Sequence, residues 1–598
     1  MRILQVLHDF LPHHVAGVEI YSDQLARALA AKHEVALLFS EVDQAEANYT
    51  LRRRAHEGIS AYELINNHRF SRFEDTYANP AVDRALRLVF DEFRPEVVHV
   101  QHLLNLSIGI VREARRRGIP VVMTLHDHWL ACANGGQRFQ RDAGRCETLD
   151  PARCGACTAH LHGVAAGARG WLRRVATSHA GGERELALAG LEADAIETPD
   201  PRFVYRDHYE HKGAQRPTWV AHPPSALGFS LALEARAELR GAVALHPSCF
   251  ALAGGGVRFL VRVNGALEFD ATLDPKRRPE DRRPLELRIP LAAGPARLEL
   301  VTEAAPPDQS DYCTAGWIDL RVSSTGGRVG TLAGRRGEPL RRIGKSLARA
   351  LSQRAQTRRV EERWQAMRRL GGEVDLFLSP SRYLRDELIR FGLPAERVLL
   401  CDHGFSSEGF ERRRDLPDHA RHFCFIGSPV PHKGLHVLLE AFEGMPEDAR
   451  LDVFGSLHYD PAYSEWLKSR TQHPGVRLAG SICHDEVPKL LACVDALVIP
   501  SIWHENSPLT LREAFLAGVP VVASRLGGHV ELLEHGGGLL YDADDPAALR
   551  AQLLRLYREP GLAQKLADDA PPVKSLASHV AEIEAIYERL GRGGAIHA

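Results

Sequence analysis

Both ends of the chain alternate short apolar segments, rich in β-branched residues, with amphipathic segments of helical period. Near the start, residues 2–7 and 34–40 have the composition of buried strands, and residues 17–32 between them repeat apolar side chains every three or four positions. The same alternation returns at residue 375 and continues from 423 to about 560. Strands separated by helices form parallel sheets covered on both faces. The two ends therefore predict two Rossmann-like, doubly wound α/β domains.

The middle of the chain has a different pattern. Residues 216–326 alternate apolar and polar side chains with period two, and turn residues such as Asn264-Gly265 separate the runs. Many short strands without helices are typical of a β-sandwich. This segment resembles inserted jelly-roll modules of the carbohydrate-binding type. Residues 335–370 are rich in arginine and have a helical period, so we expect a basic helical segment after the all-β module.

The length of 598 residues is too great for one hydrophobic core, and roughly three to four domains are expected. The expected division is an N-terminal domain over 1–175, a linker over 176–215, an inserted β-sandwich over 216–326, a basic helical segment over 335–370, the rest of the N-terminal domain over 371–405, a C-terminal domain over 421–575, and a helix over 576–598 that returns to the N-terminal domain.

Charge and hydropathy exclude several classes of protein. The net charge is −2, which offers no general argument for nucleic-acid binding. The first residues lack the apolar core and cleavage site of a signal peptide, and no stretch approaches the ~20 apolar residues of a membrane-spanning helix. We therefore expect a cytoplasmic protein.

Two glutamates, Glu505 and Glu513, flank the start of a predicted helix after an apolar strand. Ser507 suits the N-cap of this helix, and Pro508 suits its first position. Free backbone N–H groups over 506–509 would attract an anion, and ligands of open α/β sheets bind at this edge. A ligand whose phosphates bind these amides and whose hydroxyl groups bind the two carboxylates would be a nucleotide-sugar. The alternative is a helical glutamate that merely suits the dipole and a solvated glutamate in the loop.

Two other loops of the same domain add to this hypothesis. Gly427 and Lys433 lie between a strand and a helix, where a lysine can neutralise a diphosphate. Taken alone, Lys433 would be interpreted as a surface residue. Residues 526–533 add a glycine loop after the next strand.

These motifs resemble those of the retaining glycosyltransferases of family 4, which have the two-domain GT-B fold. Residues 500–521 match the Glu-x7-Glu motif and its frame, and Lys433-Gly434 matches a second motif. The resemblance is strong over 375–560 and moderate over 1–130. It implies that Glu505 contacts the donor sugar, that Glu513 contacts the ribose, and that Lys433 holds the diphosphate.

The resemblance implies a full set of site residues. The donor-binding set is Gly17, Gly427, Ser428, Lys433, Glu505, Asn506, Ser507, Pro508, Leu509 and Glu513, and the catalytic set is His126, Lys433 and Glu505. Ser428 stands where the family often has arginine, and His432 is a partial substitute. Gly17 stands alone where the family has two glycines, and His126 lines the acceptor side of the cleft.

The expected chemistry is sugar transfer with retention, without a catalytic metal or other cofactor. The substrates are a nucleoside-diphosphate sugar and a glycan or lipid-linked acceptor. Positive groups stabilise the leaving diphosphate. Glu505 and Glu513 have binding roles in the family, so they are not interpreted as the acid and nucleophile of a hydrolase.

Four cysteines lie close together in the sequence, in a segment that follows His126. Thiols at this density suit a structural zinc ion, and only the last two have the favoured C-x2-C spacing; reduced thiols in a loop are the alternative. The four residues are Cys132, Cys146, Cys154 and Cys157.

Two further features leave alternatives open. Trp219 and Trp317 offer aromatic faces for sugar rings or belong to the core of the sandwich. The basic segments at 112–118, 170–175 and 335–370 contact anionic lipid or are solvated faces. Lipid contact would fit a lipid-linked acceptor in bacterial surface-polysaccharide synthesis.

Two other functions fit the same fold. One is a catalytically weak sugar-binding or scaffolding protein, which Ser428, the single Gly17 and the inserted sandwich favour. The other is an epimerase that acts on a sugar nucleotide and needs no acceptor.

Overall fold

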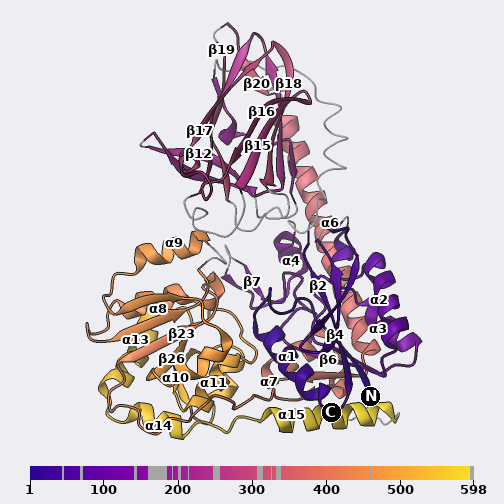
Figure 1. Ribbon diagram of the computed structural model, residues 1–598, viewed down its shortest axis with the longest axis vertical. Coiled ribbons are helices and arrows are strands. Elements are labelled where there is room, and N and C mark those ends of the chain that lie inside the picture. Colours follow the sequence, from indigo (N-terminus) through magenta and orange to yellow (C-terminus); the bar gives the residue numbers. More distant parts are fainter. Residues whose placement is uncertain are drawn as a thin grey trace.

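The structure is a computed structural model of the 598-residue chain. It describes residues 1–43, 46–67, 70, 72–140, 144–158, 185–191, 193–198, 204–212, 214–246, 256–305, 314–324, 326–331, 338–457 and 461–592. Figure 1 shows two α/β regions side by side and a region of antiparallel strands above them.

An eight-stranded sheet forms the centre of the N-terminal α/β domain. All neighbouring strands pair in parallel except the edge strand β3, which is antiparallel to β4. The strand order is β22 (Val398–Leu400), β21 (Leu376–Ser379), β6 (Val121–Thr124), β5 (Val97–Val100), β1 (Arg2–Val6), β2 (Glu34–Glu41), β4 (Ile59–Ile65) and β3 (Leu51–His56). The helices of this domain are α1 (Gly17–Ala30), α2 (Pro80–Phe93), α3 (Gly109–Arg116) and α7 (Arg382–Phe391).

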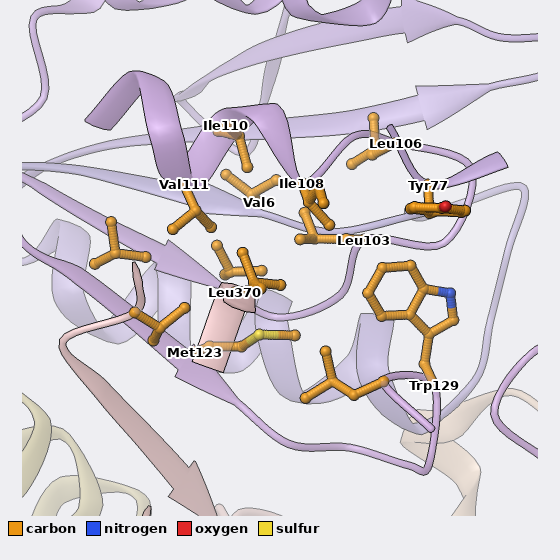
Figure 2. Close-up of a cluster of buried hydrophobic side chains, with 14 of the residues drawn as sticks. Val6, Tyr77, Leu103, Leu106, Ile108, Ile110, Val111, Met123, Trp129 and Leu370 are labelled. Atoms are coloured by element: carbon orange, nitrogen blue, oxygen red, sulfur yellow. The ribbon is translucent and has the colours of Figure 1, made fainter. Parts of the chain in front are cut away.

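Apolar side chains from strands and helices form one core on a face of this sheet. Val6 and Met123 come from strands, and Ile110 and Val111 come from α3 (Figure 2). Leu370 also enters this core, although it lies about 250 positions after Met123 in the sequence. Segments on both sides of the antiparallel strands therefore complete one α/β domain.

A six-stranded sheet forms the C-terminal α/β domain. All its neighbouring strands pair in parallel, in the order β25 (Val476–Gly480), β24 (Arg450–Phe454), β23 (His422–Ile426), β26 (Ala496–Ile499), β27 (Val521–Ser524) and β28 (Gly538–Tyr541). The helices are α8 (Leu435–Phe442), α9 (Pro461–Arg470), α10 (Val487–Leu491), α11 (Leu509–Ala517), α12 (Gly528–Leu532), α13 (Pro546–Arg558) and α14 (Leu562–Asp568). Because β23 and β26 are adjacent, the loops that follow them meet at one edge of the sheet.

Two antiparallel sheets lie between β6 and β21 in the sequence. One contains β10 (Ala195–Glu197), β13 (Ser225–Leu233), β18 (Gly294–Ala305), β15 (Gly256–Val263), β16 (Ala266–Leu273) and β20 (Val329–Thr331). The other contains β11 (Val204–His211), β12 (Ala214–Ala221), β19 (Ala315–Ser324), β14 (Ala237–Leu245), β17 (Leu285–Leu291) and β9 (Glu185–Ala187). Side chains from both sheets share one hydrophobic core.

The antiparallel region differs from the sequence expectation in one respect and decides between the two alternatives for its tryptophans. Strands β9, β10 and β11 lie within residues 176–215, which the sequence assigned to a linker. These strands are short or strongly polar, so they carry little hydrophobic signal. Trp219 and Trp317 are buried in the shared core, and the indole of Trp219 donates to the Leu188 carbonyl at 3.1 Å. Neither ring offers a free face for a sugar.

Helix α6 (Glu338–Glu373) runs from the level of the antiparallel sheets down beside α2 and α3 (Figure 1). Within its last five turns, Arg363 is buried and donates to the Leu130 and Trp129 carbonyls. Arg363 therefore does not belong to a solvated face, whereas Arg358, Arg368 and Arg369 of the same helix are exposed.

The remaining basic segments give little support to lipid contact. In α3, Arg112 pairs with Glu373 and Arg116 with Glu113, so these charges are already compensated. Residues 170–175 lie outside the described residues. Over the part of the chain that the structure covers, no helix combines the length and apolarity needed to cross a bilayer.

The last helix, α15 (Leu576–Gly591), lies against the N-terminal domain below α1 (Figure 1). Ile583 and Tyr587 pack with Leu25 of α1 in a common core. The Tyr587 hydroxyl lies 2.6 Å from Nδ1 of the buried His99. The end of the chain is therefore anchored on the first domain.

Candidate active site between the two α/β domains

Three loops interlock at the carboxyl edge of the C-terminal sheet. Gly434 follows the short helix η8 (Pro431–Lys433) and has φ +68°; a Cβ there would lie 1.9 Å from the Pro500 carbonyl oxygen. A Cβ on Gly528 would lie 1.6 Å from the carbonyl oxygen of Asn506, and the Gly528 N–H donates to the Glu505 carbonyl at 2.7 Å. Glycine is required at both positions because backbones approach so closely. The loops after β23, β26 and β27 therefore support one another.

Glu505 lies at the centre of these loops as a buried carboxylate. Its Oε1 accepts from Lys433 Nζ at 2.7 Å, from Ser501 Oγ at 2.7 Å and from Trp503 Nε1 at 2.8 Å. Burial by itself would raise the pKa of Glu505, but the positive Lys433 and these hydrogen bonds lower it to about 2. The carboxylate is therefore ionised and held in one orientation.

Helix α11 begins one residue later than the sequence predicts. Pro508 is its N-cap, with ψ 125°, and the first helical residue is Leu509. A proline in this extended conformation leaves the N-cap without a side-chain hydrogen bond. The Ser507 hydroxyl is buried without a hydrogen-bond partner in the described structure, so it does not cap the helix.

The starts of α11 and α1 face each other across the domain boundary. A Cβ on Gly17, the first residue of α1, would lie 3.6 Å from Cδ1 of Leu509. The N-termini of the two helices thus lie close together at the domain boundary. Two helix dipoles together make this region favourable for an anion.

Glu513 lies one turn into α11, four residues after Leu509 and on the same helical face. It is 5% exposed, and burial raises its pKa to about 7. His484 Nδ1 lies 3.6 Å from its carboxylate. Unlike Glu505, this carboxyl group has no lysine or arginine among the described residues close enough to offset burial.

Asn506 joins the two domains through its side chain. Its Nδ2 donates to the carbonyls of Leu125 at 3.1 Å and His126 at 3.2 Å, and its Oδ1 accepts from Ser381 Oγ. The sequence placed this residue among the donor contacts. The structure uses its amide to hold the C-terminal domain against the end of β6.

The loop after β23 carries the remaining predicted donor residues. Gly427 directly follows the strand, and Ser428 accepts a backbone bond from Val430 at 2.9 Å. His432 lies beside the Trp503 ring, with centroids 5.0 Å apart, and burial lowers its pKa to about 4. A neutral His432 can donate or accept a hydrogen bond but does not replace the charge of an arginine.

His126 lies just beyond β6, on the N-terminal side of the domain boundary. Its Nε2 is 3.0 Å from Gln101 Oε1, and its ring stacks on His403 with centroids 5.4 Å apart. Burial lowers the pKa of His126 to about 3. The imidazole is therefore a neutral hydrogen-bonding group and not a cation.

Next to His126, carboxylates and imidazoles gather at the carboxyl edge of the N-terminal sheet. His8 follows β1, its ring lies 4.5 Å from that of His102, and His102 pairs with Asp127 at 3.2 Å. Glu19 in the first turn of α1 lies 3.5 Å from His8, and burial raises its pKa to about 7. Glu19 Oε2 and His8 Nδ1 are buried without hydrogen-bond partners among the described residues. These unpaired atoms can hydrogen-bond hydroxyl groups of an acceptor.

The cysteine segment reaches the donor loops. Arg145 Nη1 lies 3.5 Å from the Ile502 carbonyl, and the Phe139 ring lies 5.9 Å from that of His432. The four thiols influence one another, since Cys132, Cys146 and Cys157 all contribute to the raised pKa of Cys154. However, no three of their sulfur atoms lie within 4.8 Å of one another. A zinc site formed by these cysteines stays a prediction.

Several residues of this site were missed by the sequence analysis. Ser501 and Trp503 hold the Glu505 carboxylate in place through hydrogen bonds. Their only signal in the sequence was their position, two to four residues before Glu505. Tyr21 and His403 surround His126, with ring centroids 4.2 Å from each other. His403 comes from the far side of the antiparallel segment, so no local pattern connects it with His126.

Comparisons with known proteins match both α/β domains. A family model described as "Glycosyl transferases group 1" matches residues 420–559, and one described as "Glycosyltransferase Family 4" matches residues 15–159. The amylovoran biosynthesis glycosyltransferase of Erwinia amylovora is 29% identical over 208 residues, covering 33% of this chain and 51% of that protein. The O-antigen chain mannosyltransferase B of Escherichia coli is 28% identical over 199 residues, covering 31% and 52%.

The chain spans about half the length of these curated relatives. Among solved structures, a sucrose-phosphate synthase from Thermosynechococcus elongatus aligns with a TM-score of 0.52 at 13% identity, covering 99% of this chain and 100% of that one. This likeness concerns the fold alone, which is the α/β GT-B fold. Both α/β domains are therefore similar to glycosyltransferases, the N-terminal one to family 4 and the C-terminal one to group 1.

Proposed function

We propose that this protein transfers a sugar, with retention of configuration, from a nucleoside-diphosphate sugar to a hydroxyl group of an acceptor. The observation that carries this proposal is the pair of Lys433 and the buried, ionised Glu505, 2.7 Å apart beside the start of α11. A lysine and a fixed carboxylate beside a helix N-terminus suit a diphosphate linked to a sugar.

The diphosphate would bind between the starts of α11 and α1, beside Leu509 and Gly17. An ammonium group has three donors, so Lys433 can keep its hydrogen bond to Glu505 and still donate to a phosphate oxygen. Lys433 and the two helix dipoles would then stabilise the negative charge that grows on the leaving diphosphate. Glu505 would accept from hydroxyl groups of the donor sugar.

Glu513 would accept from the ribose hydroxyls, one helical turn away from the phosphates. Its pKa of about 7 means that the acceptor form of the carboxylate becomes populated only near neutral pH. Hydroxyl groups that donate to it would favour the ionised form. Nucleotide binding should therefore strengthen as the pH rises through 7.

The acceptor would approach from the N-terminal domain. His126, neutral and 3.0 Å from Gln101, would orient an acceptor hydroxyl, and the unpaired atoms of Glu19 and His8 would bind neighbouring hydroxyls. In the retaining reaction, the acceptor oxygen forms its bond to the sugar on the face from which the diphosphate leaves. The acceptor proton passes to the departing phosphate oxygen, so no protein nucleophile is needed.

The relatives suggest the class of acceptor. The names of two of them refer to amylovoran biosynthesis and to the O-antigen chain. We extend this to a glycan or lipid-linked acceptor in bacterial surface-polysaccharide synthesis, with a cytoplasmic enzyme at the inner face of the membrane. The two antiparallel sheets would form an inserted jelly-roll-like domain that helps to position this acceptor.

Release of nucleoside diphosphate from UDP-, GDP- and ADP-sugars tests the proposal. One donor should support turnover that depends on an added acceptor glycan, and Glu505→Gln and Lys433→Met should lower it at least about a hundredfold, because each removes a charge at the reacting group. Proton NMR of the product should give the anomeric configuration of the donor. An isomerised sugar nucleotide formed without acceptor would indicate an epimerase, and binding without turnover would indicate a sugar-binding protein.

A further inference from the structure

The two segments that connect the α/β domains lie side by side. Residues 401–405 lead from β22 toward the C-terminal domain, and residues 574–576 lead back to α15. The Phe405 N–H donates to the Lys574 carbonyl at 2.9 Å, and the Leu576 N–H donates to the Phe405 carbonyl at 2.8 Å. We call this pair of segments the hinge. Movement of one domain relative to the other must pass through it.

Three potential metal ligands converge beside the hinge. The sulfur of Cys401, a ring nitrogen of His579 and a carboxylate oxygen of Glu582 all lie within 4.8 Å of one another. Among the residues that the structure describes, this is the one group of three or more histidine, cysteine or acidic ligand atoms at such distances. Cys401 and His579 are 2% and 1% exposed.

The geometry is close to what zinc requires. Zn–S and Zn–N bonds at a tetrahedral angle place sulfur and nitrogen about 3.6 Å apart. Cys401 Sγ and His579 Nδ1 are 3.9 Å apart, so a shift of a few tenths of an ångström would bring both onto one ion. His579 and Glu582 are three positions apart on α15 and therefore lie on one helical face.

The partner of the histidine also suits a metal ligand. His579 Nε2 lies 2.8 Å from the hydroxyl of Tyr21, a buried residue of α1. If Nε2–H donates to this oxygen, the lone pair of Nδ1 faces Cys401. A hydrogen bond on the outer ring nitrogen is the arrangement that orients metal-ligating histidines.

We propose that Cys401, His579 and Glu582 bind a zinc ion that joins α15 to the hinge. Binding would release the thiol proton of Cys401 to solvent, and the thiolate, imidazole and carboxylate would fill three positions, with water in the fourth. The His579 ring lies 6.3 Å from that of His403, which stacks on His126. An ion here would therefore stiffen the hinge next to the acceptor side of the cleft.

Lys574 competes with the ion for the carboxylate. Its Nζ pairs with Glu582 and donates to the Asp402 carbonyl at 3.1 Å. Its side chain is 28% exposed, so it can turn toward solvent when Glu582 binds a cation. Removal of the Lys574 charge should therefore tighten metal binding. If Cys401, His579 and Glu582 had only a structural role, loss of this charge would only weaken their packing.

Metal titration of the full chain tests the proposal. The protein is stripped with a chelator and titrated with Co²⁺, read by the thiolate-to-cobalt absorption band, and with Zn²⁺ against a chromophoric chelator. The experiment uses a Cys154→Ser/Cys157→Ser background, so that the cysteine segment does not contribute. We expect one equivalent with the absorption band, its loss in Cys401→Ser, and no change in the control Cys493→Ser, which removes an exposed thiol.

Two further variants separate binding from folding. Glu582→Gln keeps the shape of a side chain that is 35% exposed and should weaken zinc at least about tenfold. Lys574→Gln should bind zinc more tightly than the parent protein. The proposal is overturned if the stripped protein binds no metal in this background, or if Cys401→Ser retains the equivalent and its absorption band. Weaker binding in Lys574→Gln would also contradict it.

Discussion

Replacement of Lys433 by methionine should remove the positive charge from the donor site and leave the Glu505 carboxylate without its compensating cation. The pKa of Glu505 is lowered from 4.5 to about 2, a difference of about 2.5 units, which corresponds to about 3 kcal/mol of net stabilisation of the carboxylate. Lys433 is the main positive charge responsible. Without it, burial should raise the pKa of Glu505, and Ser501 and Trp503 would be its only remaining donors in the site.

Calorimetric titration with nucleoside diphosphates measures the consequence. A hydrogen bond to a charged group contributes about 1.5–3 kcal/mol, so Lys433→Met should raise the Kd about 10- to 150-fold. Lys433→Arg keeps the charge and should lose much less affinity for the nucleoside diphosphate. Lys489→Met removes an exposed lysine from the same domain and is the matched control. A Kd within twofold of the parent value in Lys433→Met would refute the role of Lys433.

Three other perturbations test separate parts of the site. Because its raised pKa means that the folded state holds a proton on Glu513, its contribution to stability should fall as the pH rises from 4.5 through 7, and Glu513→Gln should make the pH dependence of stability shallower, seen as a higher Tm than the parent at pH 8. Gly434→Ala should lower the Tm strongly because its Cβ would lie 1.9 Å from Pro500 oxygen, whereas Gly561→Ala, with φ +69° and open space around it, should cost only about 1–2 kcal/mol. Asn506→Ala loses its three bonds between the domains, to Leu125, His126 and Ser381, about 1 kcal/mol each, and should increase the radius of gyration in X-ray scattering. A Tm of Glu513→Gln that follows the parent at every pH, equal losses for the two glycine variants, or unchanged scattering would contradict the respective argument.

Local patterns were sufficient for the C-terminal half of the site. Lys433 and Glu505 lie in the loops after β23 and β26, and Glu513 lies in the helix that follows the second loop, so the strand-loop-helix order placed them near one edge of a sheet before any contact was known. The start of α11 was misjudged by one residue because Ser507 and Pro508 both have strong cap preferences. The extended backbone conformation of Pro508 makes it the N-cap, and the sequence does not show this conformation.

Contacts between distant segments could not be predicted from local sequence patterns. The sequence predicts a donor contact for Asn506, which stays a prediction, and gives no sign that its side-chain amide binds carbonyls at the end of β6, about 380 positions away. His126 and His403 belong to different segments of one sheet, separated by the antiparallel strands. The unpaired Oε2 of Glu19 became visible only when its burial was known.

Hydrogen–deuterium exchange with and without saturating nucleoside-diphosphate sugar tests the location of the donor site most directly. With the donor that supports turnover, peptides covering 427–434 and 505–513 should exchange more slowly, together with the start of α1, because the diphosphate orders these loops and the two helix N-termini. Lys433→Met at the same donor concentration should lose this protection. Protection confined to the antiparallel strands, or no protection with UDP-, GDP- or ADP-sugars, would contradict the account.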